Sequence, residues 1–156
     1  MAFDSFLQRG FGFGLASAVI TTLGLIIGLY FSANSKAIVV AGVITIAIAD
    51  ALSDALGMHI GTEAEAKYKT KYIWEATFTT FLAKFFIALS FLIFIILFSK
   101  TIALILSITY GIFLLSMLSY YISKKEKIKS YKVILEHLTI AAVVILVTFV
   151  IGKLFG

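Results

Sequence analysis

Long apolar runs separated by short polar segments dominate this chain. Residues 11–32, 37–61, 73–98, 101–122 and 131–155 form the five runs, and each is long enough to cross a bilayer. A membrane-spanning helix needs about 20 apolar residues, and continuous rather than alternating runs favour helices over a barrel. The pattern therefore predicts an all-α polytopic membrane protein, with one five-helix domain over residues 1–156. The chain has no proline, which predicts long helices without proline kinks.

Basic residues around these runs predict the orientation. One side of the membrane receives Arg9, Lys67, Lys69, Lys71, Lys124, Lys125, Lys127, Lys129 and Lys132, whereas the other receives Lys36, Lys100 and Lys153. Basic residues concentrate on the cytoplasmic side of membrane proteins. We therefore expect a cytoplasmic N-terminus and a C-terminus outside.

Composition supports the membrane assignment and excludes several classes of protein. The chain is 62% hydrophobic and 13% charged, whereas soluble proteins are nearer 45–50% apolar and about 25% charged. We expect an integral protein of a prokaryotic cell membrane. Because cysteine is absent, disulfides, cysteine-ligated zinc and thiol catalysis are excluded. The net charge of +5 does not indicate nucleic-acid binding, since the lysines flank the apolar runs. The N-terminus lacks the features of a removable signal peptide.

Two aspartates inside the second run are the strongest candidate for function. Asp50 and Asp54 lie one helical turn apart on the same face, which continues to Glu65 and has Met58 at its edge. Neighbouring carboxylates raise each other's affinity for protons, and a divalent cation would displace those protons. Carboxylate oxygens with one thioether suit Fe²⁺ or Mn²⁺. We therefore predict a metal site formed by Asp50, Asp54, Met58 and Glu65.

Lys84 lies in the middle of the third run, near the expected depth of the aspartates. Such a lysine is too deep to reach water easily, so it is expected to pair with Asp50 or Asp54. Two interpretations stay open. The pair joins two helices, or the ammonium occupies the site only while the transported cation is absent.

Four further ionisable side chains are candidates for an entrance or an accessory role: His59, Glu63, Glu75 and Glu136. His59 projects almost opposite to Asp50, so a position at the membrane interface is the simpler expectation. Glu136 is one helical repeat from Lys132, and that pairing explains it structurally. Glu75 lies near the start of the third run. It has the same two interpretations as Glu136, an entrance role or a structural pairing.

Two short segments resemble the vacuolar iron transporter family, which includes the plant and yeast vacuolar iron and manganese importers. They are Gly14-Leu15-Ala16-Ser17 and Ser53-Asp54-Ala55-Leu56-Gly57-Met58, followed by Glu63 and Glu65. The resemblance implies five spans, a cytoplasmic N-terminus and a homodimeric Fe²⁺/Mn²⁺–proton antiporter with its pathway between the first helices of two subunits. By this resemblance, Phe13 stands where the family has its first-helix aspartate, and Asp54 replaces its second-helix methionine. The second connection is too short for the family's glutamate-lined domain.

A glycine pair in the first run supports the dimer that the resemblance implies. Gly24 and Gly28 are separated by three residues, a spacing that lets two membrane helices approach closely. We therefore expect a homodimer through the first helix.

These observations predict a secondary transporter that exports Fe²⁺ or Mn²⁺ from the cytoplasm in exchange for protons, with no resident cofactor. Glu63, Glu65 and Glu75 would gather the ion, and Asp50 and Asp54 would hold it. The alternatives are a carrier of another cation or solute, and a non-transporting scaffold held by Asp–Lys pairs. An enzyme is not expected. The Asp50-to-Asp54 spacing resembles half of the membrane CDP-alcohol phosphotransferase signature, but the upstream Asp-Gly-x-x-Ala-Arg half is absent.

Overall fold

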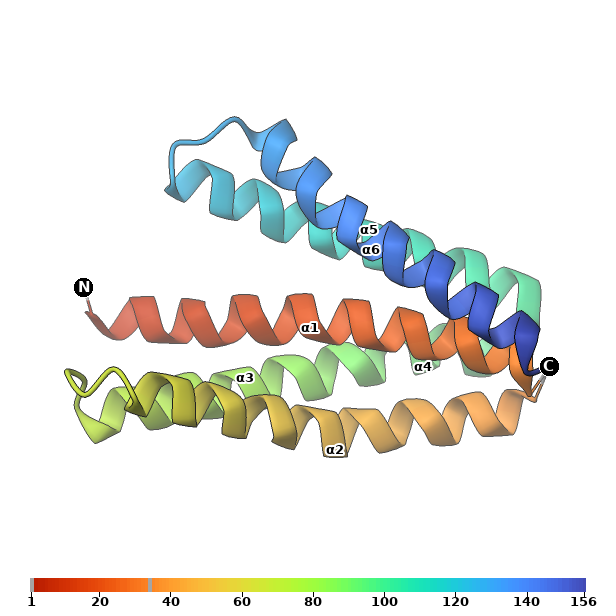
Figure 1. Cartoon of the computed structure of the whole chain (residues 1–156), viewed down its shortest axis with the longest axis horizontal. Coiled ribbons are helices and arrows are strands. Elements are labelled where there is room, and N and C mark those ends of the chain that lie inside the picture. Colours follow the sequence, from red (N-terminus) through yellow and green to blue (C-terminus); the bar gives the residue numbers. More distant parts are fainter. Residues whose placement is uncertain (1, 34) are drawn as a thin grey trace.

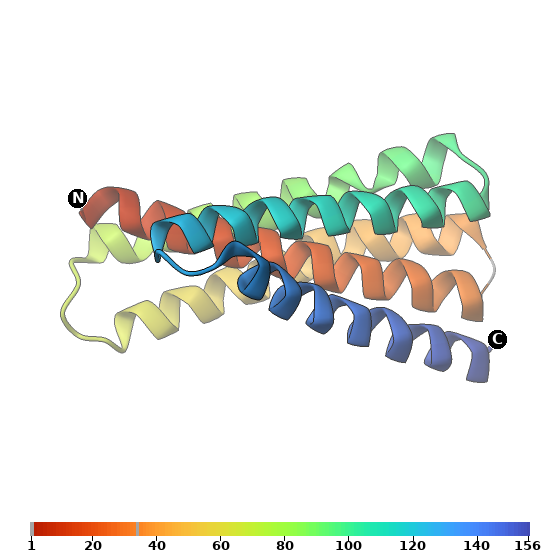
Figure 2. The same cartoon turned by 90° about the horizontal axis from the view of Figure 1, so that it is seen from above.

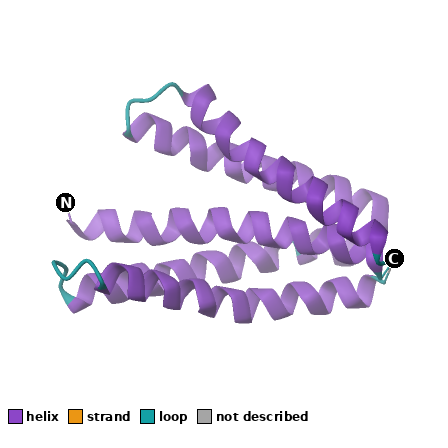
Figure 3. Cartoon of the chain, viewed as in Figure 1, coloured by secondary structure: helices purple, strands orange, loops and turns teal. Residues whose placement is uncertain are grey.

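The computed structural model is helical throughout, apart from short connections, over the residues that it describes, 2–33 and 35–156 (Figures 1 and 3). Its elements are α1 (Ala2–Ser32), α2 (Lys36–Glu63), α3 (Thr70–Ser90), α4 (Leu92–Leu97), α5 (Lys100–Lys125) and α6 (Ser130–Leu154). Side chains are described from Phe6 onward, with the exception of residue 34. The predicted all-α class is confirmed.

In the part of the chain that the structure describes, five helical stretches are long and apolar enough to cross a membrane. Four of them are α1, α2, α5 and α6, and the fifth combines α3 with α4. A helix satisfies its backbone hydrogen bonds internally, which is the requirement for a segment in lipid. The prediction of a five-helix integral membrane protein is confirmed.

Helix α1 lies between the α2/α3 pair and the α5/α6 hairpin (Figure 1). In its apolar stretch 50% of the residues are buried, against 6% for α6. The core around α1 includes Leu15, Val19 and Leu23. Helix α1 is therefore the centre of the bundle, and α6 is mostly turned toward the surrounding lipid.

The two lysine-rich connections and the N-terminus lie at the same end of the bundle (Figures 1 and 2). We call this the lysine-rich end and define it by Arg9, Lys67, Lys69, Lys124 and Lys125. The short α1–α2 and α4–α5 connections and the C-terminus lie at the opposite end. Its identification with the cytoplasmic side stays a prediction.

Helix α1 begins earlier than the apolar pattern predicts. The first apolar run was predicted to begin at residue 11, but the helix already starts at Ala2. The ring of Phe6 is buried, stacks on Tyr72 at 5.3 Å between centroids and meets Tyr68 edge-on at 4.7 Å. These contacts hold the first turns against the start of α3. Met1 and the side chain of Asp4 lie outside the described part.

The third span is interrupted although it has no proline. The backbone N–H of Phe91 donates to the carbonyl of Ala88, three residues back, at 3.3 Å. Beside it, the Ser90 hydroxyl donates to the Ile87 carbonyl at 2.6 Å and lies 3.1 Å from the Tyr110 hydroxyl. A side chain that bonds to the helix carbonyls locally tightens or bends the helix. A local hydrogen-bond change therefore separates α4 from α3.

Glycines on α1 provide close contact with other helices of the same chain. A Cβ atom at Gly10 would lie 2.5 Å from the Ala76 carbonyl oxygen on α3. One at Gly24 would meet Val144 and Thr148 of α6 at 3.1 and 3.3 Å. The carbonyl oxygen of Gly28 likewise lies against Gly152 of α6. The glycine face that was expected to meet a second copy is thus covered by α6, which corrects the location predicted for a dimer contact.

Candidate functional site

A charged cluster lies between the middle of α1, the middle of α2 and the C-terminal half of α3. The Lys84 ammonium on α3 is 2.5 Å from an oxygen of Asp50 and 2.5 Å from an oxygen of Asp54, both on α2. It also donates to the Ser17 hydroxyl on α1 at 2.8 Å. The Ser17 hydroxyl in turn donates to Asp54 at 2.6 Å. The ion pair predicted from depth is present, and it includes both aspartates.

Close packing of α1 on α3 brings Ser17 into this cluster. A Cβ atom at Gly14 would lie 2.6 Å from the Thr80 carbonyl oxygen and 3.3 Å from the Lys84 backbone nitrogen. Only glycine permits this approach without displacing backbone. Because residues three apart share a helix face, Ser17 then points toward the same region of α3 as Gly14. Glycine and serine together make α1 a wall of the site.

The cation in the cluster is more deeply buried than the anions. The Lys84 side chain is 1% exposed, against 32% for Asp50 and 20% for Asp54. An ammonium has three donor hydrogens, and the oxygens of Ser17, Asp50 and Asp54 surround it. One positive charge faces two carboxylates, so the site holds one more negative than positive charge when both carboxylates are ionised. The site can therefore attract a further cation or a proton.

Ser17 lies in the first of the two segments that resemble the transporter family, but the sequence did not predict it as a site residue. At the position of the family's first-helix aspartate stands Phe13, which is 45% exposed along a groove. Two features of the sequence point to Ser17. Ser17 lies one helical turn after Gly14, and its hydroxyl is a polar group within an apolar run. Neither signal by itself identifies the helix that Ser17 faces.

Glu65 lies away from the charged cluster, in the connection between α2 and α3. Its carboxylate pairs with Lys67 and Arg9, each at 3.0 Å. Hydrogen bonds from Lys67 and then Arg9 lower its pKa to about 2. It therefore stays ionised throughout the physiological pH range. Through Arg9 it ties the N-terminal part of α1 to this connection. Glu63, at the end of α2, is exposed.

Glu75 on α3 pairs with Lys71 at 3.8 Å and is 15% exposed. Its other carboxylate oxygen is buried without a hydrogen-bond partner among the described residues. Among the side chains that the structure describes, no group of three or more His, Asp or Glu is placed to hold a metal ion. The three glutamates expected to gather the ion at this end are therefore not assembled into one cluster.

Met58 and His59 lie in the C-terminal part of α2 and have partners of their own. The Met58 sulfur lies 3.7 Å from the Thr62 hydroxyl. The His59 Nδ1 lies 3.0 Å from the Thr77 hydroxyl, and its ring meets Trp74 edge-on at 4.7 Å. His59 therefore faces α3 near the lysine-rich end, outside the Lys84 cluster.

Glu136 lies exposed on α6. Its neighbour His137 faces α5 and lies 2.7 Å from the Ser119 hydroxyl. Helix α6 packs on α1 and α5, so Glu136 is on the opposite side of the bundle from the Asp50 and Asp54 helix. Of the predicted site residues, the structure brings together Asp50, Asp54 and Lys84.

Comparison with protein-family models, with curated protein sequences and with solved structures finds no match to this chain. The resemblance to the vacuolar iron transporters therefore stays a prediction.

Proposed function

We propose that this protein is a secondary transporter that exports a cation from the cytoplasm in exchange for protons, with Fe²⁺ or Mn²⁺ as the candidate substrate. The observation that carries the proposal is the unequal burial of the Lys84 cluster. The ammonium is 1% exposed, whereas the Asp50 and Asp54 side chains are 32% and 20% exposed. Ionisable groups in the middle of a membrane protein mark ion and proton pathways.

Lys84 acts in this proposal as an internal substitute for the transported ion. When the site is empty, its ammonium balances one carboxylate and occupies the space between the two. An arriving cation competes with the ammonium, and protons compete with both for the same oxygens. A site with these three exclusive occupants couples cation release to proton uptake, which is the requirement for exchange.

A divalent ion needs more oxygen ligands than α2 provides. Asp50 and Asp54 contribute carboxylates, and Ser17 adds a hydroxyl from α1. Fe²⁺ and Mn²⁺ bind about six ligands of this kind in octahedral sites. Water or a second subunit supplies the remaining ligands in our proposal, and Lys84 withdraws when the ion binds.

The exposed face of α2 is the surface that we propose for the second subunit. The residues at every fourth position there are small and exposed: Ala41, Thr45, Ala49, Ser53, Gly57 and Gly61. A Cβ atom at Gly57 or Gly61 would meet nothing within 4 Å. Small residues let membrane helices approach closely. A second α2 packed here would also cover the partly exposed carboxylates, which are unfavourable in contact with lipid.

The dimer can be tested by cross-linking, because the chain has no cysteine of its own. A Ser53→Cys variant in native membranes is expected to form a disulfide-linked dimer on mild oxidation. The matched control is Leu146→Cys on α6, where the side chain is 63% exposed. Equal cross-linking of the two variants, or none at Ser53→Cys, would contradict an α2 interface.

Flux measurements on proteoliposomes test the transport proposal. With an imposed pH gradient, we expect Mn²⁺ to cross in one direction and protons in the other, at rates well above those of protein-free liposomes. Na⁺ and K⁺ gradients are run in parallel. Proton-coupled flux of Na⁺ or K⁺ without Mn²⁺ flux would reject the divalent substrate. Absence of flux for all three ions would reject the proposed cation exchange and favour a scaffold in which Lys84 joins α3 to Asp50 and Asp54 of α2.

A further inference from the structure

A large groove separates the N-terminal half of α1 from the C-terminal half of α5, and its lining runs from the lysine-rich end to Leu15, two residues before Ser17. Its volume is about 1070 Å³. The α5/α6 hairpin meets α1 at the opposite end of the bundle and diverges from it toward the lysine-rich end (Figure 1). The groove lies in the opening of this wedge. Drug-sized ligands occupy pockets of about 300–1,000 Å³, so this space suits a molecule much larger than an ion.

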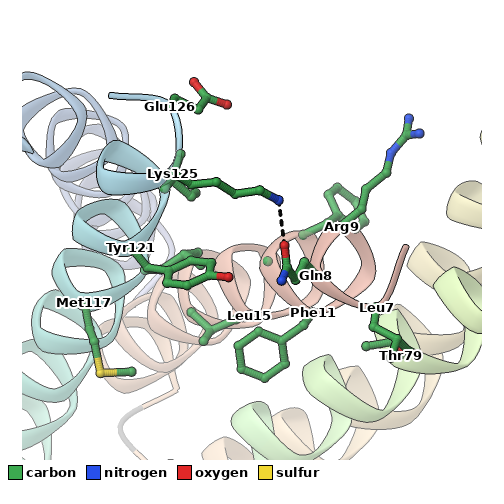
Figure 4. Close-up of a pocket in the computed structure, with 14 residues that line it drawn as sticks. Leu7, Gln8, Arg9, Phe11, Leu15, Thr79, Met117, Tyr121, Lys125 and Glu126 are labelled. Atoms are coloured by element: carbon green, nitrogen blue, oxygen red, sulfur yellow. Dashed lines mark hydrogen bonds between the residues drawn. The ribbon is translucent and has the colours of Figure 1, made fainter. Parts of the chain in front are cut away.

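The walls of the groove are apolar and its outer rim is polar. Aromatic and aliphatic side chains line its depth, among them Phe11, Leu15 and Met117. Toward the lysine-rich end the lining changes to Gln8, Arg9, Tyr121, Lys125 and Glu126. Figure 4 shows Lys125 reaching across the rim toward Gln8, with Tyr121 below it. The groove therefore has the polarity of an amphipathic molecule that lies parallel to the helices, with its head at the rim.

The rim retains hydrogen-bonding capacity for an anion. Lys125 donates to the Gln8 side-chain oxygen at 2.6 Å, which uses one of the three hydrogens of its ammonium. Arg9 contacts Glu65 through one nitrogen at 3.0 Å, and a guanidinium has five donors. Figure 4 shows the Glu126 carboxylate turned away from the Lys125 ammonium. Lys124, Lys127 and Lys129 add positive charge at the same end.

We propose that this groove binds one phospholipid with an anionic headgroup, with an acyl chain along α1 and α5 and the phosphate beside Lys125 and Arg9. The groove opens into the apolar part of a membrane, where acyl chains are the available apolar occupants. Basic pockets between membrane helices select anionic headgroups. Charge complementarity at the rim therefore distinguishes this lipid from the zwitterionic lipids around it. The proposal is independent of transport.

The test compares two adjacent lysines. Lys125 lines the groove, whereas the Lys124 ammonium lies over the Tyr120 ring at 5.2 Å from its centroid. The protein is reconstituted in equal amounts of phosphatidylglycerol and phosphatidylcholine, re-extracted, and its retained lipid measured by mass spectrometry. Wild-type protein and Lys124→Gln are expected to retain phosphatidylglycerol enriched on the order of fivefold, the effect of one basic side chain near a headgroup. Lys125→Gln is expected to lose most of this enrichment, and Lys125→Arg to keep it.

A second variant blocks the groove without changing charge. A Cβ atom at Gly12 would meet only the end of Leu118, at an ordinary 3.8 Å, so Gly12→Leu can place a side chain in the groove. This variant is expected to lose bound lipid of both kinds. Equal enrichment in Lys124→Gln and Lys125→Gln would overturn the headgroup site, because general surface charge would then explain it. If Gly12→Leu retains as much lipid as the wild type, the groove is not the binding place. The same holds if the mass spectra of the wild type show protein dimers without bound lipid.

Discussion

Replacing Asp54 by asparagine is expected to reduce proton-coupled Mn²⁺ flux in proteoliposomes at least about tenfold. The variant keeps the shape of the side chain and its ability to accept a hydrogen bond from Ser17, which lies 2.6 Å away. It removes the charge that attracts a cation and the group that can take up a proton. Lys84 then faces a single carboxylate, that of Asp50. The transported cation and the proton therefore both lose a binding group at Asp54.

Glu136→Gln is the matched control for Asp54→Asn, because it also removes one carboxylate but from the exposed face of α6. Its flux is expected to equal that of the wild type. Thermal unfolding of all three proteins shows whether the bundle is intact. Wild-type flux in a folded Asp54→Asn variant would refute the proposed mechanism.

Replacing Lys84 by methionine is expected to destabilise the bundle strongly. Methionine fills a similar volume, but it leaves Asp50 and Asp54 without the ammonium that lies 2.5 Å from each. Removing one partner of a buried ion pair costs about 3–5 kcal/mol. At the lower value, the unfolding temperature of a chain of this size falls by about 6–12 °C. The change is measured by intrinsic fluorescence, since Trp74 lies on α3.

The origin of this loss is separated by removing the carboxylates as well. The triple variant Lys84→Met, Asp50→Asn, Asp54→Asn is expected to recover most of the stability, because no charge then stays unpaired. The matched control is Lys153→Met, in the last turn of α6. It should unfold like the wild type. A triple variant as unstable as Lys84→Met would show that the packing of the lysine stem, and not its charge, is important.

Mn²⁺ binding to Lys84→Met distinguishes an exchangeable counter-ion from a fixed structural pair. If the ammonium competes for the carboxylates, its removal is expected to lower the Kd for Mn²⁺ at least about tenfold. An unchanged or higher Kd would mean that Lys84 is not a competitor for this ion.

Much of the architecture could be predicted from the chain alone, because lipid imposes simple requirements on sequence. A span needs enough consecutive apolar residues and internally satisfied backbone groups, and both can be recognised in a single chain. For this reason all five spans agree with the structure. The boundaries differed where contacts of particular side chains decided them. Phe6 holds the early turns of α1 against Tyr72, and Ser90 accompanies the break before α4.

The charged cluster was predictable in part for a related reason. A lysine and two aspartates at similar depth have few other partners in an apolar medium. Their pairing therefore followed from residue counts along the helices. The participation of Ser17 did not, because it depends on which face of α1 meets α3. That face is selected by the close fit of Gly14 against the Thr80 carbonyl.

The amino-acid sequence by itself determined the five spans, the lysine-rich end and the meeting of Lys84 with the aspartates. Each follows from a local property: hydrophobic length, charge position or depth in the membrane. Only the tertiary structure decided that α6 covers Gly24 and Gly28, that Glu65 pairs with Arg9 and Lys67, and that a groove opens between α1 and α5. These features depend on which helices are neighbours. In lipid most apolar faces are equally acceptable to the solvent, so only side-chain shape and hydrogen bonding between helices make that choice.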